Sequence, residues 1–433
     1  MEQVWRKIEV GAKRDRMRAL IKAKDIGLNF LSGSVTRTTI NTSAVLFVRL
    51  LIQTCNLLIL AYALGASLFG TFTAVTSIAA LFGILSLVGT NLLLLSEFAR
   101  GEKNGQDALA YALPTFFFTS SFFFLIFIFL TMLFIDQREV SMSALLSVGL
   151  AEVVLFPLLQ IIATYHQAHK QIAFSQVLTT IPLTARLTLA LWILFLSPLA
   201  PLSSLFVGYT ITAPLCLFIA LRSKEIIFPK ISSWRKPQPL ELKKCVKYSF
   251  LNFFSLSFGE IDKVITYNLM LSNIAGIYAA GTRIIGAMTL PIGALIISAL
   301  PKLFSDKNNP IFIKWIFITC ILYSFSSGLI ILLAASHLEK LFDASFSGLA
   351  DCLSYLTVVI PMITLRITAG FILITYDLTS ARLTYEAVGL GILIILNLLL
   401  IPPLGIIGAI VSLCISEAIM GITGWTIVFK LRK

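Results

Sequence analysis

The stretch INTSAVLFVRLLIQTCNLLILAYA, residues 40 to 63, sets the fold class of this chain. A helix crosses the hydrocarbon core of a bilayer with about 20 predominantly apolar residues. Backbone polar groups surrounded by lipid must find partners within the segment, which a helix provides. The stretch is therefore predicted to be a transmembrane helix.

Eleven further apolar runs follow it. They span residues 71 to 96, 110 to 135, 143 to 165, 173 to 196, 202 to 221, 248 to 271, 281 to 303, 311 to 335, 353 to 376, 385 to 402 and 405 to 429. Hydrophobic residues make up 58% of the 433 residues and the mean hydropathy is +0.92, which leaves no room for a soluble domain of ordinary size. The prediction is an all-α polytopic membrane protein with about twelve transmembrane helices.

The basic residues give the predicted helices an orientation. Of the 34 Lys and Arg residues, 27 fall in or beside segments that alternate onto one side, Arg382 among them, and only Arg138 and Lys340 fall on the other. Lys and Arg accumulate on the cytoplasmic side of membrane proteins. We therefore expect a multi-pass protein of the inner membrane with both termini in the cytoplasm. This bias also explains the net charge of +13, so no nucleic-acid partner is expected.

A repeated motif predicts two related halves. Gly70-Thr-Phe-Thr-Ala74 and Gly276-Ile-Tyr-Ala-Ala280 both read G-x-[FY]-x-A and lie 206 residues apart. The predicted parts are a basic cytoplasmic segment (1–39), a six-helix lobe (40–221), a basic cytoplasmic linker (222–247) and a second six-helix lobe (248–433). Two repeated lobes around a central cavity are a common architecture for alternating access.

Polar residues follow one face of the first helix in each predicted lobe. They are Thr42, Arg49, Gln53 and Asn56 in the first run and Asn252, Ser255, Gly259, Asp262 and Thr266 in the seventh. Such a face either hydrogen-bonds to other helices or lines a cavity. A charge near the bilayer centre costs roughly 2.5–3.5 kcal/mol, so Arg49 and Asp262 are expected to face water or a ligand.

Further charges inside the runs suggest an anionic ligand. Arginine offers a planar fork of donors that suits phosphate oxygens, so we expect Arg49, Arg283 and Arg366 to hold a diphosphate group. The candidate substrate-binding residues are Arg49, Gln53, Asn56, Arg186, Asn252, Ser255, Arg283 and Arg366. The candidate ion-coupling residues are Asp262, Glu152, Glu417 and Glu260. The alternative is that these charges pair with one another, as neighbouring Glu260 and Lys263 could.

The sequence gives no sign of a metal site, a cofactor or catalytic residues. His166 and His169 share a helix face without a third ligand nearby, and the six cysteines show no C-x-x-C spacing. None of these is expected in this chain.

Several motifs carry a family resemblance. They are Leu64-Gly-Ala-Ser-Leu-Phe-Gly-Thr-Phe-Thr-Ala74 with Gly89-Thr-Asn91, Glu260-Ile-Asp-Lys263, Ala275-Gly-Ile-Tyr-Ala-Ala-Gly-Thr-Arg283, Leu300-Pro-Lys302 and Ile401-Pro-Pro-Leu-Gly-Ile-Ile-Gly-Ala409. Together they resemble the bacterial polysaccharide-transporter family of the multidrug, oligosaccharidyl-lipid and polysaccharide exporter superfamily. The likeness covers nearly the whole chain, although each motif alone is loose.

The resemblance implies a flippase for an undecaprenyl-diphosphate-linked oligosaccharide, such as an O-antigen repeat unit. It would carry this unit to the periplasmic face of the inner membrane, with membrane lipids, a coupling cation (proton or sodium) and a polysaccharide polymerase as partners. Related lipid II flippases place arginines in their first and eighth helices, which Arg49 and Arg283 match by helix.

Two other functions stay open from the sequence. A cation-coupled multidrug exporter of the same superfamily would share the architecture, but such exporters commonly carry an acidic residue in the first helix, where this chain has Arg49, Gln53 and Asn56. A polysaccharide polymerase or ligase would be an enzyme with a large periplasmic loop. The longest such loop predicted here runs only from Ser336 to Asp351.

Overall fold

The computed structural model describes residues 34–99, 105–135, 140–169, 171–222, 228–305, 310–376 and 378–431. Over these residues the chain is built from helices with no strand. The helices are α2 Ser34–Ser86, α3 Thr90–Ala99, α4 Gly105–Phe134, α5 Met142–Gly149, η1 Leu150–Leu155, α6 Phe156–Ala168, α7 Ile172–Leu196, α8 Pro201–Arg222, η2 Ile231–Ser233, α9 Pro239–Leu269, α10 Ser272–Ser305, α11 Pro310–Glu339, η3 Ala344–Phe346, α12 Leu349–Leu356, α13 Val359–Thr375, α14 Thr379–Leu404 and α15 Ile406–Lys430.

The all-α polytopic membrane fold is confirmed. Among the described residues, eight helices are long and apolar enough to cross a membrane, and α12 with α13, bent by 46°, gives a ninth. The helix α2 contains the first predicted run and most of the second, while α9 and α10 carry the seventh and eighth.

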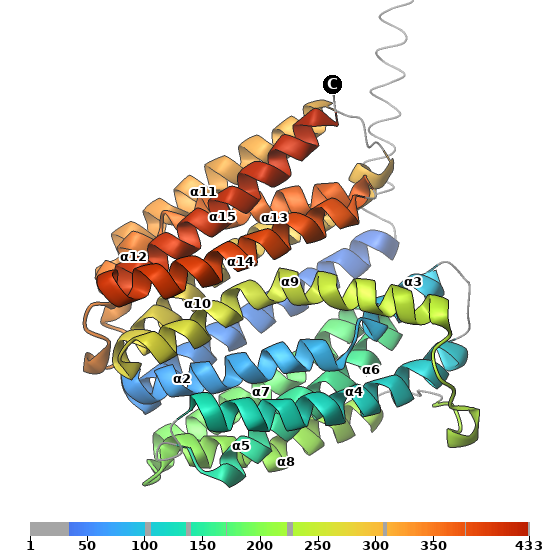
Figure 1. Cartoon of the computed structure of the whole chain (residues 1–433), viewed down its shortest axis with the longest axis horizontal. Coiled ribbons are helices and arrows are strands. Elements are labelled where there is room, and N and C mark those ends of the chain that lie inside the picture. The colour runs from blue at the N-terminus through green and yellow to red at the C-terminus, as the bar shows by residue number, and fades with distance from the viewer. Residues whose placement is uncertain are drawn as a thin grey trace, which may run out of the picture.

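The helices form two groups with three helices between them. Figure 1 shows α4 to α8 on one side and α11 to α15 on the other, while α2, α9 and α10 run between these groups. We call α2 to α8 the first lobe and α9 to α15 the second lobe. The residue boundaries predicted for the lobes stay predictions, as does the cytoplasmic placement of the termini. Residues 1 to 33 of the predicted basic segment lie outside the described residues.

One end of the bundle is marked by two sharp turns. The long helix α2 bends at Gly65, whose φ of 69° and ψ of 170° place it where a side chain would be strained. The chain turns again between Leu269 and Ser272, where α9 passes into α10. These turns meet, because the hydroxyl oxygens of Ser67 and Ser272 lie 2.7 Å apart. We call this end the hairpin end.

The opposite end is organised by the segment that joins the lobes, and we call it the linker end. There Trp234 stacks on Phe117 of α4 with ring centroids 5.9 Å apart. The backbone N–H of Arg235 donates to the carbonyl of Ala110 at 3.0 Å. Its guanidinium makes two hydrogen bonds, of 2.8 and 2.9 Å, to Glu241 at the start of α9. The first turn of α9 is thereby fixed to the first lobe.

Two predicted runs are not single α-helices. The run 71–96 is broken, because α2 ends at Ser86 and α3 begins after Gly89, which has a φ of 67°. The run 143–165 contains the π-helical turn η1 between α5 and α6, and Glu152 lies in this turn. π-turns inside helices often occur at functional sites, because they shift the side chains around them.

Candidate functional site

Two adjoining cavities lie beside α9 and α10, the first between the two lobes and the second within the second lobe. The first has a volume of about 400 Å³ and is lined by α2, η1, α7, α9 and α10. The second has a volume of about 350 Å³ and is lined by α9, α10, α12, α13 and α15. Lys263, Arg283 and Gly286 line both, so α9 and α10 form the shared wall between them.

The cavities bring together most of the residues that the sequence singles out. Gln53, Asn56, Arg186, Arg283, Glu152 and Glu260 line the first, while Arg366, Asp262 and Glu417 line the second. Arg49, Asn252 and Ser255 line neither of these two cavities. The side-chain oxygen of Asn56 is buried and has no hydrogen-bond partner among the described residues, so a ligand hydroxyl could use it.

The first cavity contains two acid–base pairs. The guanidinium of Arg186 donates to Glu152 in the π-turn and also lies 5.2 Å from the centre of the Phe156 ring. The Lys263 ammonium is 3.1 Å from both oxygens of Glu260, which also accepts a 2.6 Å hydrogen bond from the Ser77 hydroxyl. The pairing of Lys263 with Glu260, which the sequence left open as an alternative, is therefore present.

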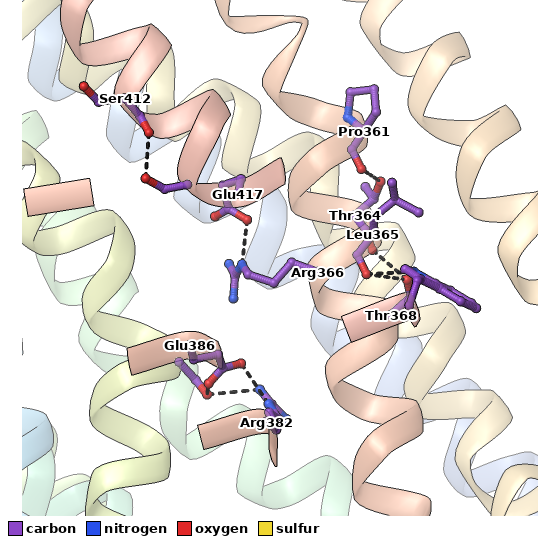
Figure 2. A network of polar contacts seen from close by, with 12 residues as sticks. Pro361, Thr364, Leu365, Arg366, Thr368, Arg382, Glu386, Ser412 and Glu417 are labelled. Atoms are coloured by element: carbon purple, nitrogen blue, oxygen red, sulfur yellow. Dashed lines mark hydrogen bonds and ion pairs between the residues drawn. The ribbon is translucent and has the colours of Figure 1, made fainter. Parts of the chain in front are cut away.

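A third pair crosses the second cavity. Figure 2 shows Arg366 of α13 reaching Glu417 of α15, and its Nε lies 2.6 Å from the carboxylate. Both side chains are buried, with 11% and 3% of their surface exposed. Removing one partner of such a pair leaves an uncompensated buried charge, which destabilises the fold, so each residue needs the other for stability.

A fourth pair is one that the sequence reasoning missed. The Nε of Arg382 donates to Glu386 at 2.8 Å, as Figure 2 shows. Ser255 joins them by donating to Glu386 at 2.6 Å and accepting from Arg382 at 3.0 Å. Arg382 was interpreted as an ordinary cytoplasmic basic residue, yet only 12% of its side chain is exposed. The spacing of four residues between an arginine and a glutamate on one helix is the signal that could have revealed the pair.

Two of the candidate arginines, Arg49 and Arg283, are left without a carboxylate partner among the described residues. Arg49 of α2 donates to the Thr179 hydroxyl at 3.3 Å. Arg283 of α10 makes no hydrogen bond or ion pair within the described part of the chain, and its guanidinium lies 5.3 and 5.6 Å from the ring centres of Phe69 and Phe72. Because it lines both cavities, its N–H donors are available to a ligand in either one.

One acid in the cavities is held without a cation. Asp262 has 1% of its surface exposed and accepts hydrogen bonds from the Tyr278 hydroxyl and from the Asn397 amide, the latter at 2.8 Å. Within the described residues no lysine or arginine forms an ion pair with it. The amide oxygen of Asn397, next to this carboxylate, is buried and unpartnered there as well. A bound proton or metal cation would neutralise this site.

The charged side chains of the site fall into those that form ion pairs and those that do not. Glu152, Glu260, Glu386 and Glu417 each neutralise a base, which leaves Arg283 and Arg49 as positive charges and Asp262 as a negative one. An anionic group would bind at Arg283, and a cation would bind at Asp262. Tyr278 and Asn397 were not predicted from sequence, because nothing in the pattern marks which neutral side chains meet an acid.

Comparison with solved structures reveals the fold to which this architecture corresponds. A multidrug-resistance MATE family transporter of the MOP superfamily, in an inward-facing conformation, gives a TM-score of 0.69 at 12% identity, over 88% of this chain and 95% of the other. An outward-facing structure of a transporter of the same description gives 0.64 at 11%, over 94% and 98%. The lipid II flippase MurJ, in an inward closed conformation, gives 0.69 at 16%, over 91% and 88%.

No family model and no curated protein sequence matches the chain. The sequence identities to these solved structures are 11 to 16%, so the comparisons show a shared fold and nothing more specific. The chain has the fold of MOP superfamily membrane transporters.

Proposed function

We propose that this protein is a flippase that moves an undecaprenyl-diphosphate-linked oligosaccharide, such as an O-antigen repeat unit, from the cytoplasmic to the periplasmic leaflet of the bacterial inner membrane. It would do so by alternating access of the two cavities, without acting as an enzyme. The lipid-linked oligosaccharide is its substrate, membrane lipids surround it, and a polysaccharide polymerase would receive the product.

The observation that carries the proposal is the guanidinium of Arg283, which has no hydrogen-bond or ion-pair partner among the described residues. A buried cation is normally paired with an acid, and the other arginines of the two cavities, Arg186 and Arg366, are paired in this way. Arg283 keeps its N–H donors free in a space shared by both cavities. A diphosphate, with two negative groups that accept paired hydrogen bonds, suits this donor set.

The direction of transport follows from the predicted orientation. If the linker end faces the cytoplasm, the contact between Ser67 and Ser272 closes the periplasmic side. The headgroup would enter from the cytoplasm while the polyprenyl tail stays in lipid.

Asp262 is the acid that we propose for ion coupling. Glu152, Glu260 and Glu417, the other candidates, are each neutralised by a neighbouring base. Asp262 has only neutral hydrogen-bond donors, so protonation or cation binding changes its charge without breaking an ion pair. A proton or sodium gradient would then bias the alternation of the lobes.

The same carboxylate favours a second candidate, a cation-coupled multidrug exporter. MATE transporters share the fold, and an acid without a cationic partner could bind an organic cation as well as a proton. The free Arg283 weighs against this function, because it would repel a cationic drug from both cavities.

A strain lacking the gene separates the two functions. For a flippase, undecaprenyl-diphosphate-linked oligosaccharide accumulates in the cytoplasmic leaflet and long-chain surface polysaccharide disappears. Normal polysaccharide with increased drug sensitivity would instead identify an exporter. Single repeat units reaching the surface without being polymerised would point to a polymerase.

Complementation of this strain tests Arg283 itself. Arg283→Gln should fail to restore the polysaccharide, while Arg222→Gln should restore it. Arg222 is a matched control, because its guanidinium also lies over a phenylalanine ring, that of Phe218 at 5.1 Å, but outside both cavities. Full restoration by a normally inserted Arg283→Gln protein would refute the assigned role.

A further inference from the structure

The two glycines of the repeated motif touch each other at the hairpin end. A Cβ atom added to Gly276 would lie 1.9 Å from the carbonyl oxygen of Ala66, and one added to Gly70 would lie 2.3 Å from that of Ser272. Each added Cβ would also come within 3.2 Å of the other glycine's backbone nitrogen. The lobes therefore meet here backbone to backbone, through equivalent residues of the two repeats.

Ser345 of η3 adds to this contact from the second lobe. Its hydroxyl accepts a hydrogen bond of 2.9 Å from the backbone N–H of Ala66, next to the bend at Gly65. We call the contact formed by Ala66, Ser67, Gly70, Ser272, Gly276 and Ser345 the hairpin gate. Opening the cavities toward this end requires the gate to separate.

The residues around Arg283 belong to the same helical segments as the gate. Arg283 follows Gly276 by seven residues, which is two turns of α10, so both lie on the same face of that helix. Phe69 and Phe72 flank Gly70 on α2. The cation and the rings therefore come from opposite lobes, and in this structure, where the gate is closed, they meet.

The rings affect how Arg283 can bind an anion. An aromatic ring attracts a guanidinium through its electron-rich face and accepts none of the in-plane N–H donors as a carboxylate does. Phe69 and Phe72 thus stabilise the buried charge while leaving the donors free for a ligand. Phe72 is itself held by Phe206, with ring centroids 5.8 Å apart, so it is a fixed surface.

We propose that Phe69 and Phe72 are positioning residues that hold Arg283 ready to bind the diphosphate while the hairpin gate is closed, and that opening the gate removes this support and releases the headgroup. The ligand in this inference rests on the proposed function. Headgroup binding and gate position are then linked by one contact between the lobes.

Binding of undecaprenyl diphosphate to the full-length protein in lipid nanodiscs gives the first test. Arg283→Gln should abolish binding, and Phe72→Leu should weaken it about five-fold, the loss expected for one cation–π contact worth about 1 kcal/mol. Phe72→Tyr keeps the ring and should bind as the wild type does, and Phe218→Leu, which removes the ring under Arg222, is the matched control. Wild-type affinity in a folded Phe72→Leu protein would overturn the inference.

A second measurement needs no substrate and so separates this inference from the proposed function. A Ser67→Cys/Ser272→Cys pair places two thiols where hydroxyls now lie 2.7 Å apart, and its rate of disulfide formation reports how often the gate is closed. Arg283→Gln and Phe72→Leu should each slow this rate, and their combination should slow it no further than Arg283→Gln alone, because Phe72→Leu removes one of the two ring contacts that Arg283→Gln removes. If the two substitutions slowed the cross-linking rate independently, so that their effects multiplied in the combined variant, the inference would be overturned.

The two measurements together assign each failure to its cause. If the wild-type protein does not bind undecaprenyl diphosphate but the cross-linking effects are not additive, the proposed substrate is wrong and the link between Arg283 and the gate stands. If binding is strong but the cross-linking rates are unchanged by either variant, the substrate is supported and the positioning role is refuted.

Discussion

The side-chain amide of Asn397 on α14 donates a 2.8 Å hydrogen bond to the Asp262 carboxylate on α9. This bond joins two helices of the second lobe at an acid that has no cationic partner among the described residues. The pair fixes where the carboxylate points while leaving its charge uncompensated. The charge state of Asp262 is therefore the feature of the second cavity most open to change by an ion.

Replacing this acid should uncouple transport from its driving force. Asp262→Asn keeps the shape and can still accept from Tyr278, so the protein should fold while its transport becomes independent of an imposed proton or sodium gradient. Flux of the lipid-linked oligosaccharide into proteoliposomes, with and without each gradient, measures this. Asp351→Asn, an exposed acid at the start of α12, is the control. Unchanged gradient dependence would exclude Asp262 as the coupling site.

The pair of Arg366 and Glu417 should be more important for stability than for binding. Glu417→Gln leaves a buried guanidinium without its acid, which should cost on the order of 3 kcal/mol and lower the thermal unfolding midpoint in detergent. Arg366→Met/Glu417→Leu removes both charges and should recover most of this loss. A double variant as unstable as the single one would show that the pair contributes more than mutual neutralisation.

The hairpin gate should not tolerate a methyl group. In Gly276→Ala the new Cβ meets the Ala66 carbonyl at 1.9 Å, a separation that real Cβ atoms do not show, so the helices must move apart. We expect transport to fall at least ten-fold and the Ser67→Cys/Ser272→Cys pair to cross-link more slowly, in line with a displacement of this size near a binding site. Gly391→Ala on α14 has nothing within 4 Å and should be neutral. Normal transport by Gly276→Ala would mean that the gate need not close fully.

Replacing Arg235 should make the segment at the linker end more susceptible to proteolysis. Arg235→Gln loses a charged, two-bond contact with Glu241 and the position of the guanidinium over the Tyr111 ring at 5.0 Å. Because a third of the Arg235 side chain is exposed, at 34%, the loss should be modest, about 1 kcal/mol. Limited proteolysis should cleave residues 228 to 238 faster in Arg235→Gln than in Lys236→Gln, whose side chain is exposed. Equal cleavage of both would argue against a fixed linker.

Hydrophobicity was sufficient to predict where most of the helices lie, because each span must hide its own backbone from lipid. It could not predict the bend that lets α2 carry two runs, nor the π-turn at Glu152, since both keep the apolar composition unchanged. The repeated motif singled out Gly70 and Gly276, and the structure brings these two residues together. That they touch each other depends on how the lobes dock, which no local pattern encodes.

The site was harder to predict for the same reason. Arg366 and Glu417 lie 51 residues apart, and only the packing of α13 against α15 makes them partners. The sequence hypothesis assigned Arg366 and Arg283 the same role, and the structure gives them different surroundings. Lys263 and Glu260, three residues apart on one helix, could be paired in advance because the helix itself brings them together.

The distances between partners along the chain also matter for biogenesis. Helices enter the membrane in the order of synthesis, and Glu260 with Lys263 or Arg382 with Glu386 can neutralise each other within one emerging helix. Glu152 and Arg186 become paired when the next helix, α7, arrives. Arg366 is the exception, because its partner Glu417 lies in α15, the last helix to be synthesised. A chain that ends before Glu417 therefore has Arg366 in its membrane domain without the acid that pairs with it. Such a chain would also lack the ion pair that joins α13 to α15, so its second lobe should be less stable than that of the complete protein.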